Sequence, residues 1–209
     1  ELIKGQHRAV LLAKNPEGYA NLCRLLSARH EQEPFEFIET VQRYRAGLVI
    51  ISDDVVALTA WQAQVGEDLY VELTPGAELQ EAVTFSRQSR IPPVATTRAA
   101  MLRPTDFEAH RLLRAIAENT TLSRLRPERC CASSHWLMPC SVIARALPHV
   151  PEALGNTRRI ADQCATAWDF QTTIFPSFRQ MSAAAAFETV RTNTYNGAVW
   201  RYDVLPQVI

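Results

Sequence analysis

The sequence has no long apolar run, no excess of charge of either sign and few glycines. Its apolar runs, such as 9–13 and 47–51, fall far short of the roughly 20 residues that a membrane-spanning helix needs. The 22 basic residues balance 22 acidic ones, which argues against a general positive field for nucleic acid. The seven glycines are scattered and form neither a phosphate-binding loop nor a GxGxxG fingerprint. The first residues lack the pattern of a signal peptide, so we expect a soluble, cytoplasmic protein with no membrane partner.

The five cysteines do not make the even-numbered set of a disulfide framework, and we expect reduced thiols. Cys23 and Cys164 fall on apolar helical faces and are predicted to be core residues. Four metal-binding residue types lie close together in the sequence, namely Cys130, Cys131, His135 and Cys140. Their spacing matches no usual CxxC zinc pair, so it favours a loop or hairpin over a metal site.

Strand-like and helix-like segments alternate along the first 120 residues. Buried strands are predicted at 9–13, 47–52, 68–74 and 92–97, and helices at 55–64 and 76–90. Asn15 followed by Pro16 marks the start of a further helix. Its predicted buried face consists of Tyr19, Leu22, Cys23 and Leu26. This alternation indicates βαβ units and a mainly parallel sheet or barrel.

The pattern changes after the helix that follows residue 104. Thr105 and Glu108 predict a capping box for that helix. Its predicted apolar face consists of Ala109, Leu112, Leu113 and Ile116. We predict an irregular region at 121–140, followed by helices at 141–147 and 151–164. An extended connector at 174–178 and a last helix at 183–200 are predicted after them. The helix at 151–164 is predicted to bury Leu154, Thr157, Ala161 and Cys164. We therefore expect two parts, an α/β region at 1–120 and an irregular and helical extension at 121–209.

The order of these segments resembles the N-terminal region of the bacterial family C DNA polymerases, the DNA polymerase III alpha subunits. The stretches that carry the resemblance are VLLAKNPEGYANLCRLLSARH, GLVIIS, PPVATT, LRPTDFEAHRLLRAIAENTTL, VPEALGNTRRIADQC and IFPSF. The closing TYNGAVWRY is similar to the helix that leads toward the polymerase body. The resemblance implies a polymerase-and-histidinol-phosphatase (PHP) domain, a distorted (β/α)7 barrel, here incomplete at its N-terminus because the first strand is missing. A barrel without that strand would have an exposed sheet edge.

The resemblance also implies where a metal site would lie, at the C-terminal ends of the strands. Five positions match the family's site, namely Glu1, His30, Asp54, Arg98 and Ala100. Arg98 and Ala100 replace the Asp and His of an Asp-x-His motif, and the HxH motif of the first strand is absent from the sequence. A guanidinium has no lone pair for a metal and repels metal ions. We therefore predict a vestigial site without metal or catalytic residues.

Two placements of Arg98 follow from this substitution. In the first, Arg98 takes the place of the lost cations and pairs with Asp54 and Glu1 inside the old cleft, because buried carboxylates need a partner. In the second, Arg98 points into solvent from a turn. The sequence alone leaves both placements open.

The resemblance implies a non-catalytic scaffold segment of a replicative alpha subunit or of its error-prone relative. Its implied partners are the remainder of that subunit, a proofreading exonuclease, and DNA through the parent protein. Mg²⁺ would belong to the parent's palm, which the chain lacks, so the resemblance alone does not make the chain an enzyme. The alternatives are a metal-dependent PHP phosphoesterase or 3′–5′ exonuclease, and a free-standing PHP-derived protein that binds a partner.

Overall fold

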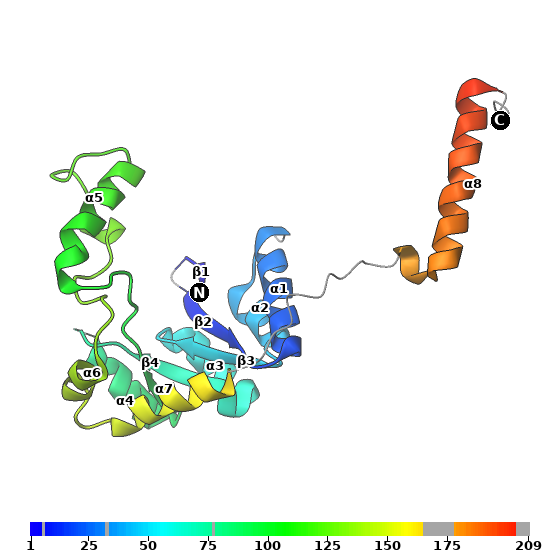
Figure 1. Cartoon of the computed structure of the whole chain (residues 1–209). Helices are drawn as coiled ribbons and strands as arrows, with labels where there is room; N and C mark the ends of the chain where they lie inside the picture. Colours follow the sequence, from blue (N-terminus) through cyan, green and yellow to red (C-terminus); the bar gives the residue numbers. More distant parts are fainter. Residues whose placement is uncertain (6, 32–33, 77, 165–177, 204–209) are drawn as a thin grey trace. The chain divides into compact units, whose positions relative to one another are not determined.

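The structure is a computed structural model that describes residues 1–5, 7–31, 34–76, 78–164 and 178–203 (Figure 1). Its contacts divide the chain into two units, Glu1–Thr166 and Ala167–Ile209. The first unit holds an open α/β sheet with its helices, and the described part of the second, 178–203, holds a long helix. The prediction of an α/β fold is confirmed at this level. The barrel and the functional division at about residue 120 stay predictions.

The sheet has five strands in the order of the sequence. They are β1 (Leu2–Lys4), β2 (His7–Ala13), β3 (Leu48–Ser52), β4 (Leu69–Leu73) and β5 (Pro93–Ala95). The four predicted strands are thereby confirmed, and β1 is added to them. Strands β3, β4 and β5 are parallel, as predicted, but β2 is antiparallel to both of its neighbours. Helices α1 (Pro16–Glu31) and α2 (Phe37–Arg43) separate β2 from β3. The chain enters β3 at the end of the sheet where β2 ends, since Ala13 pairs with Leu48.

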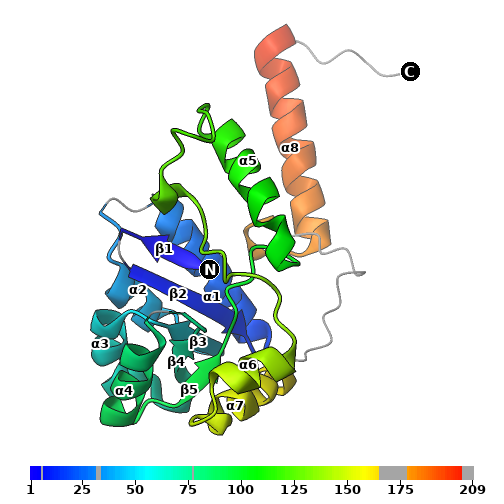
Figure 2. The same ribbon diagram turned by 90° about the vertical axis from the view of Figure 1, so that its left-hand side faces the viewer.

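The sheet carries apolar side chains on both faces because strand residues alternate in direction. In β3, Leu48 and Ile50 belong to the larger core, and Val49 and Ile51 to a smaller one on the other face. Seven helices of the first unit are described: α1 (Pro16–Glu31), α2 (Phe37–Arg43), α3 (Val55–Val65), α4 (Leu79–Ser89), α5 (Phe107–Ala117), α6 (Cys140–Ala146) and α7 (Pro151–Gln163). Figure 2 shows this unit from the side. The larger core collects side chains from all of these helices except α5.

The buried face of α1 differs from the predicted one. The helix buries Gly18, Asn21, Leu25 and Ala28. Tyr19, Leu26 and the predicted core residue Cys23 are exposed. The reason is a close backbone approach, since a Cβ on Gly18 would lie 2.0 Å from the carbonyl oxygen of Gly47. The Asn21 side chain donates to the Ala46 carbonyl at 2.9 Å and turns the same face inward.

The predicted apolar face of α5 is also exposed. Leu112, Leu113 and Ile116 are 50%, 66% and 67% exposed, and Ala115 is buried instead. Figures 1 and 2 show the reason, since α5 stands off from the sheet and from the helices that cover it. The predicted capping box is wrong as well, because the helix is preceded by a 3-10 turn and its N-cap is Asp106.

Helix α7 closes the edge of the sheet at β5. Asn156 and Thr157 donate side-chain hydrogen bonds of 2.8 Å each to the Pro93 and Ala95 carbonyls. Of the predicted face, Leu154 packs against the larger core and Cys164 against the smaller one, but Thr157 and Ala161 are exposed. The fully buried residues of α7 are Ala153 and Ile160.

The last helix, α8 (Ala183–Tyr202), confirms the predicted helix at 183–200. Ser182 caps it by accepting a hydrogen bond from the backbone N–H of Ala185. Most of the predicted connector at 174–178 lies outside the described residues. Across the described ranges, no helix combines the length and the apolar character that a membrane crossing needs.

The contact between Gly18 and Gly47 gives a first prediction. G18A forces a methyl group into the Gly47 backbone, so we expect the free energy of unfolding to fall by about 3 kcal/mol. Chemical denaturation followed by circular dichroism measures the change. The matched control is G155A in α7, where a Cβ meets nothing within 4 Å. It should change stability by less than about 1 kcal/mol, in the stabilising direction. Equal effects of the two variants would contradict the close approach.

Candidate functional site

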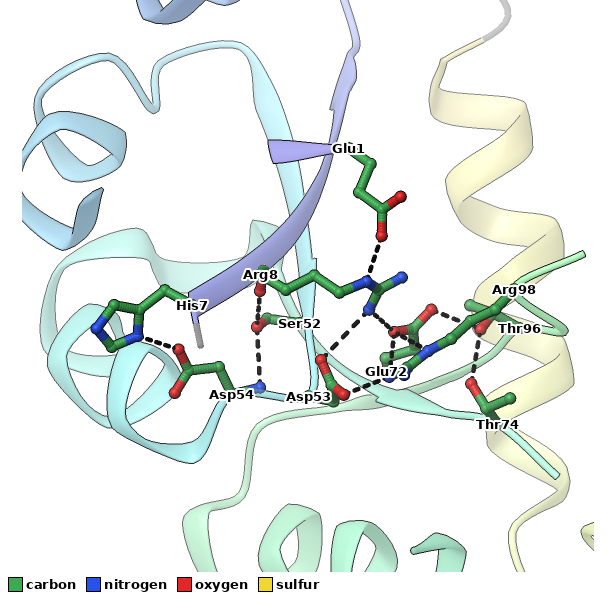
Figure 3. A network of polar contacts seen from close by, with 10 residues as sticks. All are labelled: Glu1, His7, Arg8, Ser52, Asp53, Asp54, Glu72, Thr74, Thr96 and Arg98. Atoms are coloured by element: carbon green, nitrogen blue, oxygen red, sulfur yellow. Dashed lines mark hydrogen bonds and ion pairs between the residues drawn. The ribbon is translucent and has the colours of Figure 1, made fainter. Parts of the chain in front are cut away.

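A network of charged side chains lies at one end of the sheet (Figure 3). Because β2 is antiparallel to β3, its first residues meet the C-terminal ends of β3, β4 and β5. Arg8 comes from β2, Asp53 follows β3, and Glu72 lies in β4. Arg98 lies in the turn after β5. Segments that are far apart in the sequence thus bring their charges to one place.

Glu72 is the centre of the network and is only 2% exposed. Its Oε2 atom accepts hydrogen bonds from Arg8 Nη1 and from Arg98 Nε, the latter at 3.0 Å. Its Oε1 atom accepts one from Thr96 Oγ1 at 2.6 Å. Thr96 Oγ1 also lies 3.1 Å from Thr74 Oγ1. The buried carboxylate is therefore held by two guanidinium groups and a hydroxyl, which offset the cost of burying it.

Two further carboxylates complete the network. Asp53 pairs with Arg98 Nη2 and lies 3.3 Å from Arg8 Nη1. Glu1 pairs with Arg8 Nε. Of the two placements that the sequence left open for Arg98, the structure shows the paired one, but the partners are Asp53 and Glu72 and not Asp54 and Glu1. Two guanidinium groups thus lie among three carboxylates, as Figure 3 shows.

Asp54 is directed elsewhere because it caps a helix. Its Oδ1 accepts hydrogen bonds from the backbone N–H groups of Val56 and Ala57, at 2.9 and 3.1 Å, and so begins α3. Its Oδ2 lies 2.5 Å from His7 Nδ1. The His7 ring stacks on Phe37 with 5.6 Å between ring centroids. Asp54 and His7 therefore form a second polar pair beside the network, away from Arg98.

The remaining predicted positions lie outside these contacts. His30 is exposed in the last turn of α1, and none of the network's contacts involves it. Ala100 is exposed, and its backbone N–H donates to the His135 carbonyl at 2.9 Å. Of the five predicted residues, the structure brings Arg98 and Glu1 into the network and Asp54 next to it. Their role as a vestigial metal site stays a prediction.

The network shifts the pKa values of its members. Burial raises the pKa of Glu72, but the hydrogen bonds from Arg8 and Thr96 and the arginine charges outweigh it, so this pKa is lowered. Burial likewise raises the pKa of Asp53, and Arg98 and Arg8 lower it further than burial raises it. Burial lowers the pKa of Arg8, whereas Glu72 and Glu1 raise it above its ordinary value. Both carboxylates therefore stay ionised to a lower pH than they would without the arginines.

Two hollows open beside the network, with volumes of about 320 and 560 Å³. Both are lined by Glu72, Arg98 and His135. The pKa of His135 is lowered by burial and by the charges of Arg98 and Arg8, which favours the neutral imidazole. Within the described ranges, no group of three or more His, Cys, Asp and Glu side chains is placed to hold a metal ion. Of the carboxylates that line the hollows, Asp53 and Glu72 are paired with arginine.

The sequence reasoning missed Arg8, Asp53 and Glu72. Glu72 had a usable signal, because it is the charged residue in the buried strand LYVEL, and a buried charge requires a partner. Arg8 carries a weaker signal, as a cation at the start of an apolar strand. Asp53 carries no signal of its own, because the adjacent Asp54 has the same carboxylate and the sequence does not show which of the two joins the network.

Removing Arg98 should destabilise the protein. R98A leaves the buried Glu72 with one guanidinium, and we expect the free energy of unfolding to fall by about 2 kcal/mol. The control is R158A, which removes an exposed pair with Asp162. That variant should change stability by less than about 0.5 kcal/mol. Urea denaturation of the variants measures both changes, and an R98A value no larger than that of R158A would refute the pairing.

The lowered carboxylate pKa values predict a dependence of stability on pH. The ordinary pKa values are 4.5 for Glu72 and 3.8 for Asp53, and the folded state lowers both. Their contribution is therefore complete above about pH 4.5 and is lost as the pH falls through the folded values. E72Q removes the charge at similar size, so its deficit in unfolding free energy should shrink from about pH 7 to about pH 3. A deficit that does not change with pH would contradict the ionic role of Glu72.

The chain matches bacterial polymerases in comparisons with known proteins. It is 27% identical over 195 residues to the DNA polymerase III subunit alpha of Haemophilus influenzae, covering 80% of this chain and 17% of that protein. It is 26% identical over 226 residues to the subunit of the same name from Pseudomonas aeruginosa, covering 95% and 19%. For the error-prone DNA polymerase of Symbiobacterium thermophilum the identity is 25% over 250 residues, covering 99% and 23%.

No protein-family model matches the chain. The matches span about a fifth of the length of these curated relatives. They nevertheless take in most or nearly all of this chain, and they agree with the resemblance that its sequence motifs carry. The chain is thus a relative of one part of the bacterial DNA polymerase III alpha subunits and error-prone DNA polymerases.

Proposed function

We propose that the chain is a non-catalytic PHP-type segment of a bacterial replication polymerase of the alpha-subunit kind, and that it acts as a scaffold. The similarity to the alpha subunits supports the polymerase context. The open α/β sheet, with helices on its larger core, is compatible with part of a distorted (β/α)7 barrel. The proposed partners are the remainder of the alpha subunit, a proofreading exonuclease, and DNA through the parent protein, all in the cytoplasm.

The observation that carries the non-catalytic proposal is the position of the two arginines. Arg8 and Arg98 lie at the C-terminal strand ends, where the family resemblance places a metal cluster. Their charges are matched there by Glu72, Asp53 and Glu1. A metal ion at this place would have to displace guanidinium groups from the same oxygens and would be repelled by them. In this proposal, the two arginine charges neutralise the carboxylates in place of bound metal cations.

Metal analysis tests this proposal. Purified protein is incubated with Zn²⁺ and Mn²⁺, desalted and analysed by mass spectrometry for bound metal, and hydrolysis of a phosphodiester substrate is measured in parallel. We expect the wild-type chain to retain no stoichiometric metal and to leave the substrate intact. R98A frees oxygens of Asp53 and Glu72 and should retain more Mn²⁺ than the wild type, whereas R158A should not.

Stoichiometric metal on the wild-type chain together with hydrolysis would overturn the scaffold proposal. It would favour the alternative of a metal-dependent PHP phosphoesterase or 3′–5′ exonuclease. The parent reading frame distinguishes the polymerase segment from a free-standing partner-binding protein. Continuation into a palm domain, which would bind Mg²⁺ for nucleotide transfer, supports the polymerase segment, and a stop codon after Ile209 contradicts it.

A further inference from the structure

Residues 102–134, which include α5, form an arm with a narrow attachment to the sheet. Inside this arm, the backbone N–H of Cys131 donates to His110 Nε2 at 3.1 Å, and Arg114 Nε donates to the Arg129 carbonyl at 2.7 Å. In the described part of the chain, every hydrogen bond and ion pair of the arm is made within it or to His135 and Trp136. The arm is therefore bonded mainly to itself.

The attachment is a short neck made of residues 100–101 and 135–137. The backbone N–H groups of Ala100 and Met101 donate to the His135 carbonyl at 2.9 and 3.2 Å. The N–H of Leu137 donates to the Met101 carbonyl at 2.9 Å, and Met101 forms an isolated parallel bridge with Trp136. These bonds join the two segments of the neck, 100–101 and 135–137, to each other. They do not by themselves fix the direction in which the neck leaves the sheet.

Arg98 lies at the base of the neck and has an unusual backbone. Its φ is 46°, in the left-handed region that costs free energy for any residue with a Cβ. Its guanidinium meanwhile reaches back to the sheet, with Nη2 2.9 Å from Glu72 Oε2 and a second pair to Asp53. The backbone of Arg98 thus lies in the turn, and its guanidinium group is bound at the ends of β3 and β4.

We propose that Arg98 is a clamp that sets the direction of the arm, by holding the left-handed turn from which the neck leaves the sheet. Its fork of N–H donors bridges carboxylates that follow or belong to different strands, so the turn has one favoured orientation. The inference rests on these contacts and does not depend on whether the chain is a PHP-type polymerase segment. Arg98 then fixes the position of the exposed face of α5 relative to the sheet.

Hydrogen exchange followed by mass spectrometry on the whole chain tests the clamp. In R98A, the amides of 99–103 and 134–138 should exchange at least about tenfold faster than in the wild type. The labelling times are kept short enough that neither the wild type nor R98A exchanges through global unfolding, so the lower overall stability of R98A does not contribute. At these times, amides of β3, β4 and α5 should change much less, because the sheet and the arm keep their own bonds. R158A, the matched arginine control, should leave the neck unchanged.

Two further variants separate the clamp from other effects. R98K keeps the charge but cannot bridge Asp53 and Glu72 with a fork, so its neck should exchange at a rate between those of the wild type and R98A. R98G relieves the left-handed backbone and also removes the head group, and its neck should exchange as fast as that of R98A. The proposal is overturned if R98A leaves neck exchange unchanged, if it accelerates β3 and β4 equally, or if R98K or R98G behaves as the wild type.

Discussion

The burial of one carboxylate sets the requirements for the whole end of the sheet. Glu72 is fixed in β4 by strand pairing on both sides, so its counter-charges have to come from other elements. Arg8 reaches it from β2 and Arg98 from the turn after β5. Because a buried charge without a partner is strongly destabilising, the ends of these three elements are constrained together. The antiparallel direction of β2 is part of this arrangement, since it brings Arg8 to the same end.

The adjacent residues Asp53 and Asp54 have the same side chain but different roles, because their side chains point in different directions. Asp53 joins the arginine network, and Asp54 begins α3 and binds His7. The hydroxyl of Ser52 connects the two regions, since it donates to the Arg8 carbonyl and accepts from the N–H of Asp54. The network is therefore continuous with the start of a helix that lines the larger core.

Much of the fold could be predicted from the sequence, because short segments rich in apolar residues identify β3 and β4. The direction of β2 could not be predicted, because its apolar pattern is the same whether the strand runs parallel or antiparallel to its neighbour. The inward face of α1 depends on the contact between Gly18 and Gly47, which hydrophobic periodicity does not encode. For the site, the sequence left open whether Arg98 is paired or points into solvent. The choice between Asp53 and Asp54 depends on backbone direction at the end of β3.

The contact of α7 with β5 affects which edge of the sheet can pair with a further strand. The Pro93 and Ala95 carbonyls, which face away from β4, already accept hydrogen bonds from α7, and proline has no N–H to offer. Another strand would therefore have to compete with α7 for these two carbonyls, and it would find no N–H donor at Pro93. The opposite margin is β1, three residues long with a half-exposed Ile3. Extension of the sheet, by more of the same polypeptide or by a second molecule, is thereby directed to the β1 side.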